Sequence, residues 1–213
     1  ARRTRIATNV RRLVEAANGK DVLYFPARHD HFCVQAGDGY AAHVGGVTAV
    51  SSDAQAAWWG GRGIGTIPHA LIAAYGGDTV LAAERFAAWA PEDLNVVVLV
   101  DFENDSVRTS LEVARALGPR LWGVRLDTST DLVDRSLADE VGDGLAGVSE
   151  PLVRKVRDAL DGAGFGGMRI VVSGGFTVER VRAFEERGVP VDAYGVGSSL
   201  LRGENDFTAD VVV

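Results

Sequence analysis

The sequence predicts an α/β fold, a single domain whose parallel sheet is either open or closed into a barrel. Short β-branched apolar runs recur along the chain, and helix-like segments separate them from residue 95 to the end. Each strand-plus-helix unit takes roughly 25 to 40 residues, as in folds whose parallel strands are joined by crossover helices. With 46% hydrophobic and 24% charged residues among 213, the composition suits one globular domain with a sizeable core.

The expected strands are apolar runs in which hydrophobic residues are continuous rather than alternating. This pattern is typical of parallel strands, which are buried on both faces. The runs cover residues 22–25, 96–102, 121–127, 169–175 and 193–199. Because active sites in such folds lie at the carboxyl ends of the strands, the residues that end these runs are the first candidates for chemistry.

The expected helices are marked by capping residues and by one apolar face each. A basic leading helix within residues 1–20 is expected to turn its arginines toward solvent. Further helices are predicted at 106–117, 150–161 and 178–187. The weakly patterned acidic stretch 128–147 is predicted to be a long loop, either a lid or a mobile segment.

Composition excludes several classes of function. No run approaches the ~18–20 apolar residues of a membrane span, and none has the character of a signal peptide, so a cytoplasmic protein without membrane contact is expected. Cys33 is the only cysteine, which leaves no disulfide framework and predicts a partly buried, unreactive thiol. The net charge of −7 argues against a nucleic-acid partner, and lysines at only positions 20 and 155 leave few candidates for Schiff-base chemistry.

Two aspartates end neighbouring apolar runs. Asp101 and Asp127 could hold Mg²⁺ on a diphosphate or stabilise a cationic transition state. The structural alternative is that they cap helices or pair with Arg125. The residues alone leave both possibilities open.

Glycine-rich turns follow the last two runs. Ser173-Gly174-Gly175 and Gly195-Val196-Gly197-Ser198 could each offer backbone N–H groups to a phosphate. Either turn alone could equally need glycine only for its backbone angles. Two such turns in succession resemble the phosphate site of the last units of a barrel, which favours phosphate binding.

Arg28 follows the first run and could grip a carboxylate or phosphate in a forked geometry. The neighbouring His29, Asp30 and His31 lack partners at recognisable ligand spacing, so a metal site there is disfavoured. His69, inside the sequence GTIPHALIAAYGG, is by itself best explained as a histidine packed at the start of a helix.

Taken together, the motifs GTIPHALI, LVDF, GVRLDT, VSGGFTVERV and YGVGSSL resemble, in order and spacing, the nicotinate phosphoribosyltransferases, most nearly their archaeal-type branch. The resemblance extends from residues 5–8 to residues 206–212. It implies the type II phosphoribosyltransferase fold, an irregular TIM-like α/β barrel of parallel strands with the site at its mouth. It also implies that most of the family's N-terminal domain is absent from residues 1–213.

The reaction that this resemblance implies joins nicotinate to phosphoribosyl diphosphate, giving nicotinate mononucleotide and diphosphate for NAD biosynthesis and salvage. ATP is the implied co-substrate, and Mg²⁺ arrives on the substrate diphosphate rather than on dedicated protein ligands. A homodimer or higher homo-oligomer is also implied.

Residue roles carry over by position. His69 matches the histidine that ATP phosphorylates, and it is grouped with Asp101 and Asp127 as catalytic. The positions that match substrate-binding residues are Phe25, which corresponds to the aromatic residue stacked on the pyridine ring, Arg28, Thr66 and Arg125. The positions that match the phosphate-binding turns are Ser173, Gly174, Gly175, Gly195, Gly197 and Ser198.

The chain departs from the usual family pattern at Pro26, His29, Thr48 and Phe102. One alternative is quinolinate phosphoribosyl transfer on the same barrel, which needs extra basic residues for a second carboxylate and no phosphorylated histidine. A second is a non-catalytic phosphate- or nucleotide-binding remnant of such an enzyme, which the missing N-terminal domain and the departures at His29, Thr48 and Phe102 support.

Overall fold

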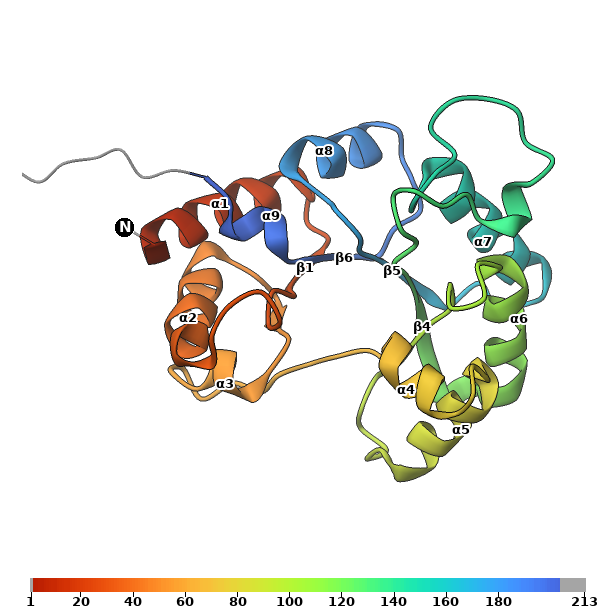
Figure 1. Ribbon diagram of the computed structural model, residues 1–213, viewed down its shortest axis with the longest axis horizontal. Coiled ribbons are helices and arrows are strands. Elements are labelled where there is room, and N and C mark those ends of the chain that lie inside the picture. Colours follow the sequence, from red (N-terminus) through yellow and green to blue (C-terminus); the bar gives the residue numbers. More distant parts are fainter. Residues whose placement is uncertain (1, 204–213) are drawn as a thin grey trace, which may run out of the picture.

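Six parallel strands form one curled sheet in the order β2-β1-β6-β5-β4-β3. The structure, a computed structural model, describes residues 2–203, so the motif at 206–212 lies outside the described residues. Figure 1 shows the helices placed around the outside of the strands, with α2 and α3 at one end of the strand order and α4, α5 and α6 at the other. The predicted parallel α/β architecture is confirmed.

The strands are β1 (Asp21–Tyr24), β2 (Ala49–Val50), β3 (Val96–Leu99), β4 (Leu121–Leu126), β5 (Arg169–Val172) and β6 (Ala193–Val196). The helices are α1 (Arg2–Ala16), α2 (Gln35–Gly45), α3 (Asp53–Ala56), α4 (His69–Ala74), α5 (Thr79–Trp89), α6 (Ser106–Leu117), α7 (Glu150–Gly162), α8 (Val178–Glu186) and α9 (Ser198–Leu201). Short 3₁₀ turns lie at Phe32–Val34, Gly118–Arg120 and Arg135–Leu137.

The two edges of the sheet are joined through the segment 63–67, which Figure 1 shows as part of the chain crossing from α3 to α4. Gly63 forms a parallel bridge to Val50 of β2, and Ile67 forms one to Val98 of β3. The Ile64 amide donates to Val50 O and the Ile67 amide to Val97 O, both at 2.8 Å. The sheet therefore curls into an irregular barrel that is closed by single bridges rather than by a full strand.

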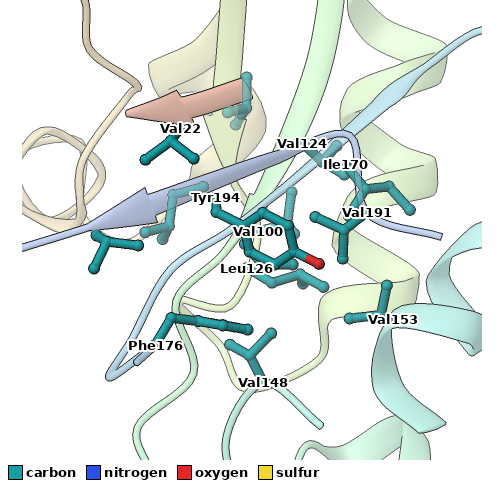
Figure 2. Close-up of a cluster of buried hydrophobic side chains, with 14 of the residues drawn as sticks. Val22, Val100, Val124, Leu126, Val148, Val153, Ile170, Phe176, Val191 and Tyr194 are labelled. Atoms are coloured by element: carbon teal, nitrogen blue, oxygen red, sulfur yellow. The ribbon is translucent and has the colours of Figure 1, made fainter. Parts of the chain in front are cut away.

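Alternate residues along each strand face different surroundings. In β1 and β6, Val22 and Tyr194 belong to the large core between sheet and helices, whereas Leu23 and Ala193 belong to a small cluster on the other face. Figure 2 shows part of the large core, with Tyr194 and Phe176 among the branched aliphatic side chains. Phe25, which directly follows β1, packs against this small cluster.

Helix starts follow the capping residues that the sequence predicts. Ser149 caps α7 by accepting from the Leu152 amide, and Thr177 caps α8 by accepting from the Arg180 amide. The leading helix α1 buries Ile6, Val10 and Leu13, and its arginines at 3, 11 and 12 are exposed, as expected. No helix within residues 2–203 is both long and apolar enough to span a bilayer.

Other expectations need correction. The strands are shorter than the predicted runs, because turn residues such as those at 173–175 leave the ladder of backbone hydrogen bonds. The loop 128–147 is anchored in its middle, where Asp134 is fully buried and accepts from the amide and hydroxyl of Ser106. Cys33 is exposed rather than partly buried, because it lies in a 3₁₀ turn that buries none of its residues.

Candidate active site at the mouth of the barrel

A cavity of about 500 Å³ opens at the carboxyl ends of the strands. It is lined by residues at or directly after the ends of β1, β2, β4, β5 and β6, and by the segment that leads into and begins α4. The predicted site residues that line it are Phe25, Arg28, Thr66, His69, Arg125, Asp127, Ser173, Gly174, Gly175, Gly195, Gly197 and Ser198. Residues far apart in the sequence are therefore gathered at one place by the parallel topology.

Arg125 is the centre of the polar network in this cavity. Its Nε donates to Ser173 Oγ, its Nη1 to Thr66 Oγ1 and its Nη2 to Asp127 Oδ2, all at 2.8 Å. Ser173 Oγ donates in turn to Asp127 Oδ1 at 2.7 Å. The planar guanidinium fork thus fixes three side chains from three different segments in one geometry. Pairing with Arg125, the structural alternative for Asp127, is present in the site itself.

Phe25 lies flat against the backbone of the last strand. A β-carbon built on Gly195 would come within 2.8 Å of Cδ2 and Cε2 of the Phe25 ring, so only glycine leaves room for the ring there. The guanidinium carbon of Arg125 lies 5.6 Å from the centroid of the same ring. The cavity therefore offers an aromatic face beside a cationic group, a surface suited to a flat, electron-poor or anionic ring.

His69 begins the short helix α4, and its side chain is 50% exposed to the cavity. The alternative of a packed core histidine is therefore wrong. Its Nε2 lies 3.2 Å from Asp101 Oδ1, a fully buried oxygen that has no other hydrogen-bond partner among the described residues. The hydrogen bond to Asp101, with the charges of Asp101 and Asp127, raises the pKa of His69 above its ordinary value, against smaller opposing effects of partial burial and Arg125.

Asp101 lies beneath the cavity rather than on its surface. Its Oδ2 accepts from the backbone amide of Asp127 at 2.6 Å, and the residue is 7% exposed. Of the predicted site residues it alone does not line the cavity. Its place in the site is that of a support, which links the strand end that carries Asp127 to the imidazole of His69.

The two predicted phosphate turns line the same wall. Gly174 and Gly175 have φ angles of +85° and +73°, in the left-handed region that favours glycine. On Gly197, a built β-carbon would lie 2.9 Å from the Phe25 carbonyl oxygen. Glycine is thus required here for its backbone angles and close approach, and both turns also expose their backbone to the cavity.

Arg28 brings a further cation to the cavity and forms no ion pair with any of residues 2–203. His29 lines the cavity beside it. Asp30 pairs instead with Arg2, and His31 accepts the amide of Cys33. In the described part of the chain, no three His, Cys, Asp or Glu residues are placed to hold a metal ion.

Sequence reasoning missed several residues of the site. Ser51, Phe176 and Ser199 line the cavity, and Ser199 Oγ donates to Phe176 O at 2.7 Å. Ser51 follows β2, a strand of two residues that has no recognisable apolar run. Ser199 and Phe176 each lie one residue beyond a quoted glycine turn, so adjacency to those turns was the available signal.

Comparisons with known proteins identify the family of the chain. Residues 6–203 match the family described as quinolinate phosphoribosyl transferase, C-terminal domain. A nicotinate phosphoribosyltransferase of Mycobacterium tuberculosis is 34% identical over 98% of this chain and 43% of its own length. One from Bacillus subtilis is 28% identical over 93% of this chain and 37% of its own length. The chain thus spans less than half the length of these curated relatives.

A solved structure supports the same assignment. Nicotinate-nucleotide pyrophosphorylase from Pyrococcus furiosus is 32% identical, with a TM-score of 0.79 over 94% of this chain and 47% of the other. A nicotinate phosphoribosyltransferase from Porphyromonas gingivalis, 18% identical with a TM-score of 0.65 over 97% of this chain and 50% of its own, shares the fold. The chain belongs to the type II phosphoribosyltransferase family, and its structure is that family's barrel.

Proposed function

We propose that this chain is the barrel domain of a phosphoribosyltransferase that transfers the phosphoribosyl group of phosphoribosyl diphosphate to nicotinate in NAD biosynthesis. The observation that carries the proposal is one cavity that combines an aromatic face, the Arg125–Asp127 pair, two glycine turns and the His69–Asp101 pair. Each of these groups can bind or stabilise one part of the reacting molecules. The sequence relatives at 34% and 28% identity support the choice of nicotinate.

Nicotinate is a flat ring that bears one carboxylate. The Phe25 ring provides a surface for stacking, and Arg28, unpaired among residues 2–203, is available to the carboxylate. The Arg125 guanidinium is already neutralised by Asp127. One available arginine fits a monocarboxylate better than a dicarboxylate, which favours nicotinate over quinolinate.

In the transfer, the pyridine nitrogen forms a bond to the anomeric carbon while the bond from that carbon to the diphosphate oxygen breaks. Positive charge develops on the ribose and negative charge on the leaving diphosphate. Asp127, held in place by Arg125 and Ser173, is the carboxylate of the cavity wall that can stabilise the ribose. The turns at 173–175 and 195–198 offer backbone N–H groups to the phosphate of the substrate.

Magnesium fits this site as a companion of the diphosphate. Both oxygens of Asp127 already accept hydrogen bonds and Asp101 is buried, so the protein offers few free carboxylate oxygens to a metal. An ion that keeps water and phosphate oxygens as its main ligands matches this donor set. When bound, Mg²⁺ supplies neutralisation of the charge that develops on the diphosphate.

His69 is the proposed acceptor of a phosphoryl group from ATP. Because Asp101 lies at Nε2, the neutral imidazole is favoured with its proton there, which leaves the lone pair on Nδ1. Nδ1 forms a bond to the terminal phosphorus, and the bond from that phosphorus to ADP breaks. Hydrolysis of this phosphohistidine is the step coupled to transfer in the proposal.

The test is product formation. The full-length protein is incubated with nicotinate, phosphoribosyl diphosphate, Mg²⁺ and ATP, and the nicotinate mononucleotide formed is measured by chromatography. Absence of the product with and without ATP refutes the proposal, and product from quinolinate without ATP assigns the rival activity. Ligand binding with no turnover identifies a binding module. Light scattering tests the accompanying expectation of a homodimer or larger homo-oligomer.

A further inference from the structure

Arg180 contacts the turn 173–175 but is not among the residues that line the cavity. Its Nη1 donates to Gly174 O at 3.0 Å and its Nη2 to Val148 O at 2.7 Å. The guanidinium carbon lies 4.3 Å from the centroid of the Phe176 ring and 5.7 Å from that of Phe184. Arg180 itself does not line the cavity, although both glycines of the turn do.

The positive charge of Arg180 has no carboxylate partner in the described part of the chain, and burial lowers the pKa of its guanidinium. Arg180 is also in the first turn of α8, after the cap at Thr177. The helix dipole disfavours a cation at this end of a helix. A partly buried, unpaired cation at a helix N-terminus lowers the stability of the free protein, and a bound anion nearby would offset that cost.

The contact with Gly174 also determines where an N–H group points. A trans peptide is planar, so the carbonyl of Gly174 and the amide of Gly175 point in opposite directions. With the carbonyl held toward Arg180, the Gly175 N–H is directed to the other side of the turn. That amide donates no hydrogen bond within residues 2–203, and Gly175 lines the cavity. The turn thus presents the unused Gly175 N–H donor on the side opposite to the Arg180 cation.

We propose that Arg180 is a positioning residue for the phosphate monoester of the phosphoribosyl group. It fixes the Gly174–Gly175 peptide with its N–H toward the cavity, and its charge adds to the field at that point. The naming of the phosphoribosyl group as ligand rests on the proposed function. The binding of a sugar phosphate at this turn does not depend on which base is the acceptor.

The test uses ribose 5-phosphate as the probe and calorimetry at low salt as the measurement. Arg180→Gln removes the charge and keeps one donor, so its affinity for the probe should fall about tenfold or more. Arg180→Lys keeps the charge and should recover most of the affinity. In the transfer assay, Arg180→Gln should raise the KM for phosphoribosyl diphosphate and leave the KM for nicotinate unchanged.

Arg157 offers a matched control. It also caps two backbone carbonyls, Met168 O at 2.6 Å and Phe165 O at 3.1 Å, but it pairs with Asp161 and does not line the cavity. Arg157→Gln should therefore bind the probe as the wild-type chain does. Unfolding temperatures of all variants separate lost affinity from lost fold.

Three results overturn the inference: wild-type affinity in folded Arg180→Gln, an equal loss in Arg157→Gln, or no binding of ribose 5-phosphate by the wild-type chain. If Arg180→Gln does not fold, NMR on the wild-type chain decides. The Nε–H resonance of Arg180 should then shift with the probe while that of Arg157 stays, and no shift overturns the inference. Probe binding that depends on Arg180 supports the inference even where the full-length protein makes no nicotinate mononucleotide, and that second result refutes the proposed function.

Discussion

Replacing Asp101 with asparagine should disable phosphorylation of His69 while leaving the barrel folded. The asparagine carbonyl can still accept from the Asp127 amide, which Asp101 Oδ2 now does at 2.6 Å. Its NH₂ group then faces His69 Nε2, where Asp101 Oδ1 now lies at 3.2 Å. An N–H donor at Nε2 favours the tautomer with its proton on Nδ1, and that tautomer has no lone pair for the phosphoryl group.

The size of the effect follows from the geometry. A hydrogen bond between charged groups contributes about 1.5–3 kcal/mol. Because His69 is half exposed and the separation of 3.2 Å is long for such a pair, the lower end applies. About 1.5 kcal/mol corresponds to roughly a tenfold fall in the rate of phosphorylation, and the change of tautomer adds to it.

The assay is incorporation of radiolabelled phosphate from ATP, with NMR titration of His69 in the same variant. Asp101→Asn should lower the pKa of His69, since the hydrogen bond to Asp101 is the largest cause of its elevation. Asp134→Asn is the control, because Asp134 is also buried but accepts hydrogen bonds from Ser106 and Ser136 and does not line the cavity. An unchanged His69 titration, or full phosphate incorporation in Asp101→Asn, would refute the reasoning.

Further predictions concern the pH dependence of stability, the Phe25 ring, the Arg125 guanidinium and the core. The pKa of His69 is higher in the folded chain than in the unfolded chain, so its pairing with Asp101 stabilises the fold fully at pH values below the pKa of the unfolded chain. This stabilisation is lost as the pH rises through the pKa of the folded chain. Asp101→Asn should therefore lower the free energy of unfolding more at about pH 5.5 than at about pH 9. Gly195→Ala should displace the Phe25 ring, cost about 1–3 kcal/mol and raise the KM for nicotinate about tenfold. Arg125→Lys loses at least two charged hydrogen bonds, so kcat/KM should fall about 100-fold. Leu126→Ala, in the core of Figure 2, should cost about 2–5 kcal/mol and lower Tm by at least about 4 °C in a thermal melt.

Each of these substitutions has a control elsewhere in the chain. Gly162→Ala adds a methyl with no atom within 4 Å, Arg115→Lys alters an exposed arginine, and Val141→Ala truncates a fully exposed side chain. All three should behave as wild type in the same assays. A nicotinate KM that is unaffected by Gly195→Ala would contradict the role of the Phe25 face, and equal stability losses at both pH values would contradict the charge state assigned to His69.

The core strands were predictable because a strand that is buried on both faces appears in the sequence as a continuous apolar run. The runs at 96–102 and 169–175 each contain a whole strand of four residues, and the run at 22–25 contains three of the four residues of β1. Other elements have no such pattern in the sequence. Helix α2 contains three glycines in eleven residues, which hides its helical pattern, and β2 has only two residues. The segment 63–67 is extended because of its bridges to β2 and β3, and its own residues do not form an apolar run that predicts a strand.

The candidate site was predictable where chemistry follows a strand, and less so where tertiary contacts decide. The strand-end rule was enough to select Asp127 and Gly174 for the cavity wall. It could not show that Asp101 is buried below that wall, because its pairing with His69 spans 32 residues of sequence. Arg180 gave one overlooked signal, a cation in the first turn of a helix where the dipole disfavours it.

The closure of the barrel through 63–67 has a consequence for local opening. The segment is joined to the sheet edges by the amides of Ile64 and Ile67, with one further bond from the Leu99 amide to Ile67 O at 3.4 Å. Breaking these bonds, together with the hydrogen bond from Arg125 Nη1 to Thr66 Oγ1, would free Thr66, and with it the approach to His69, without unpairing any of the six strands. Such a sub-global opening costs far less than global unfolding, so amide hydrogen exchange at Ile64 and Ile67 should be fast beside that of β5 and slow down when substrate fills the cavity.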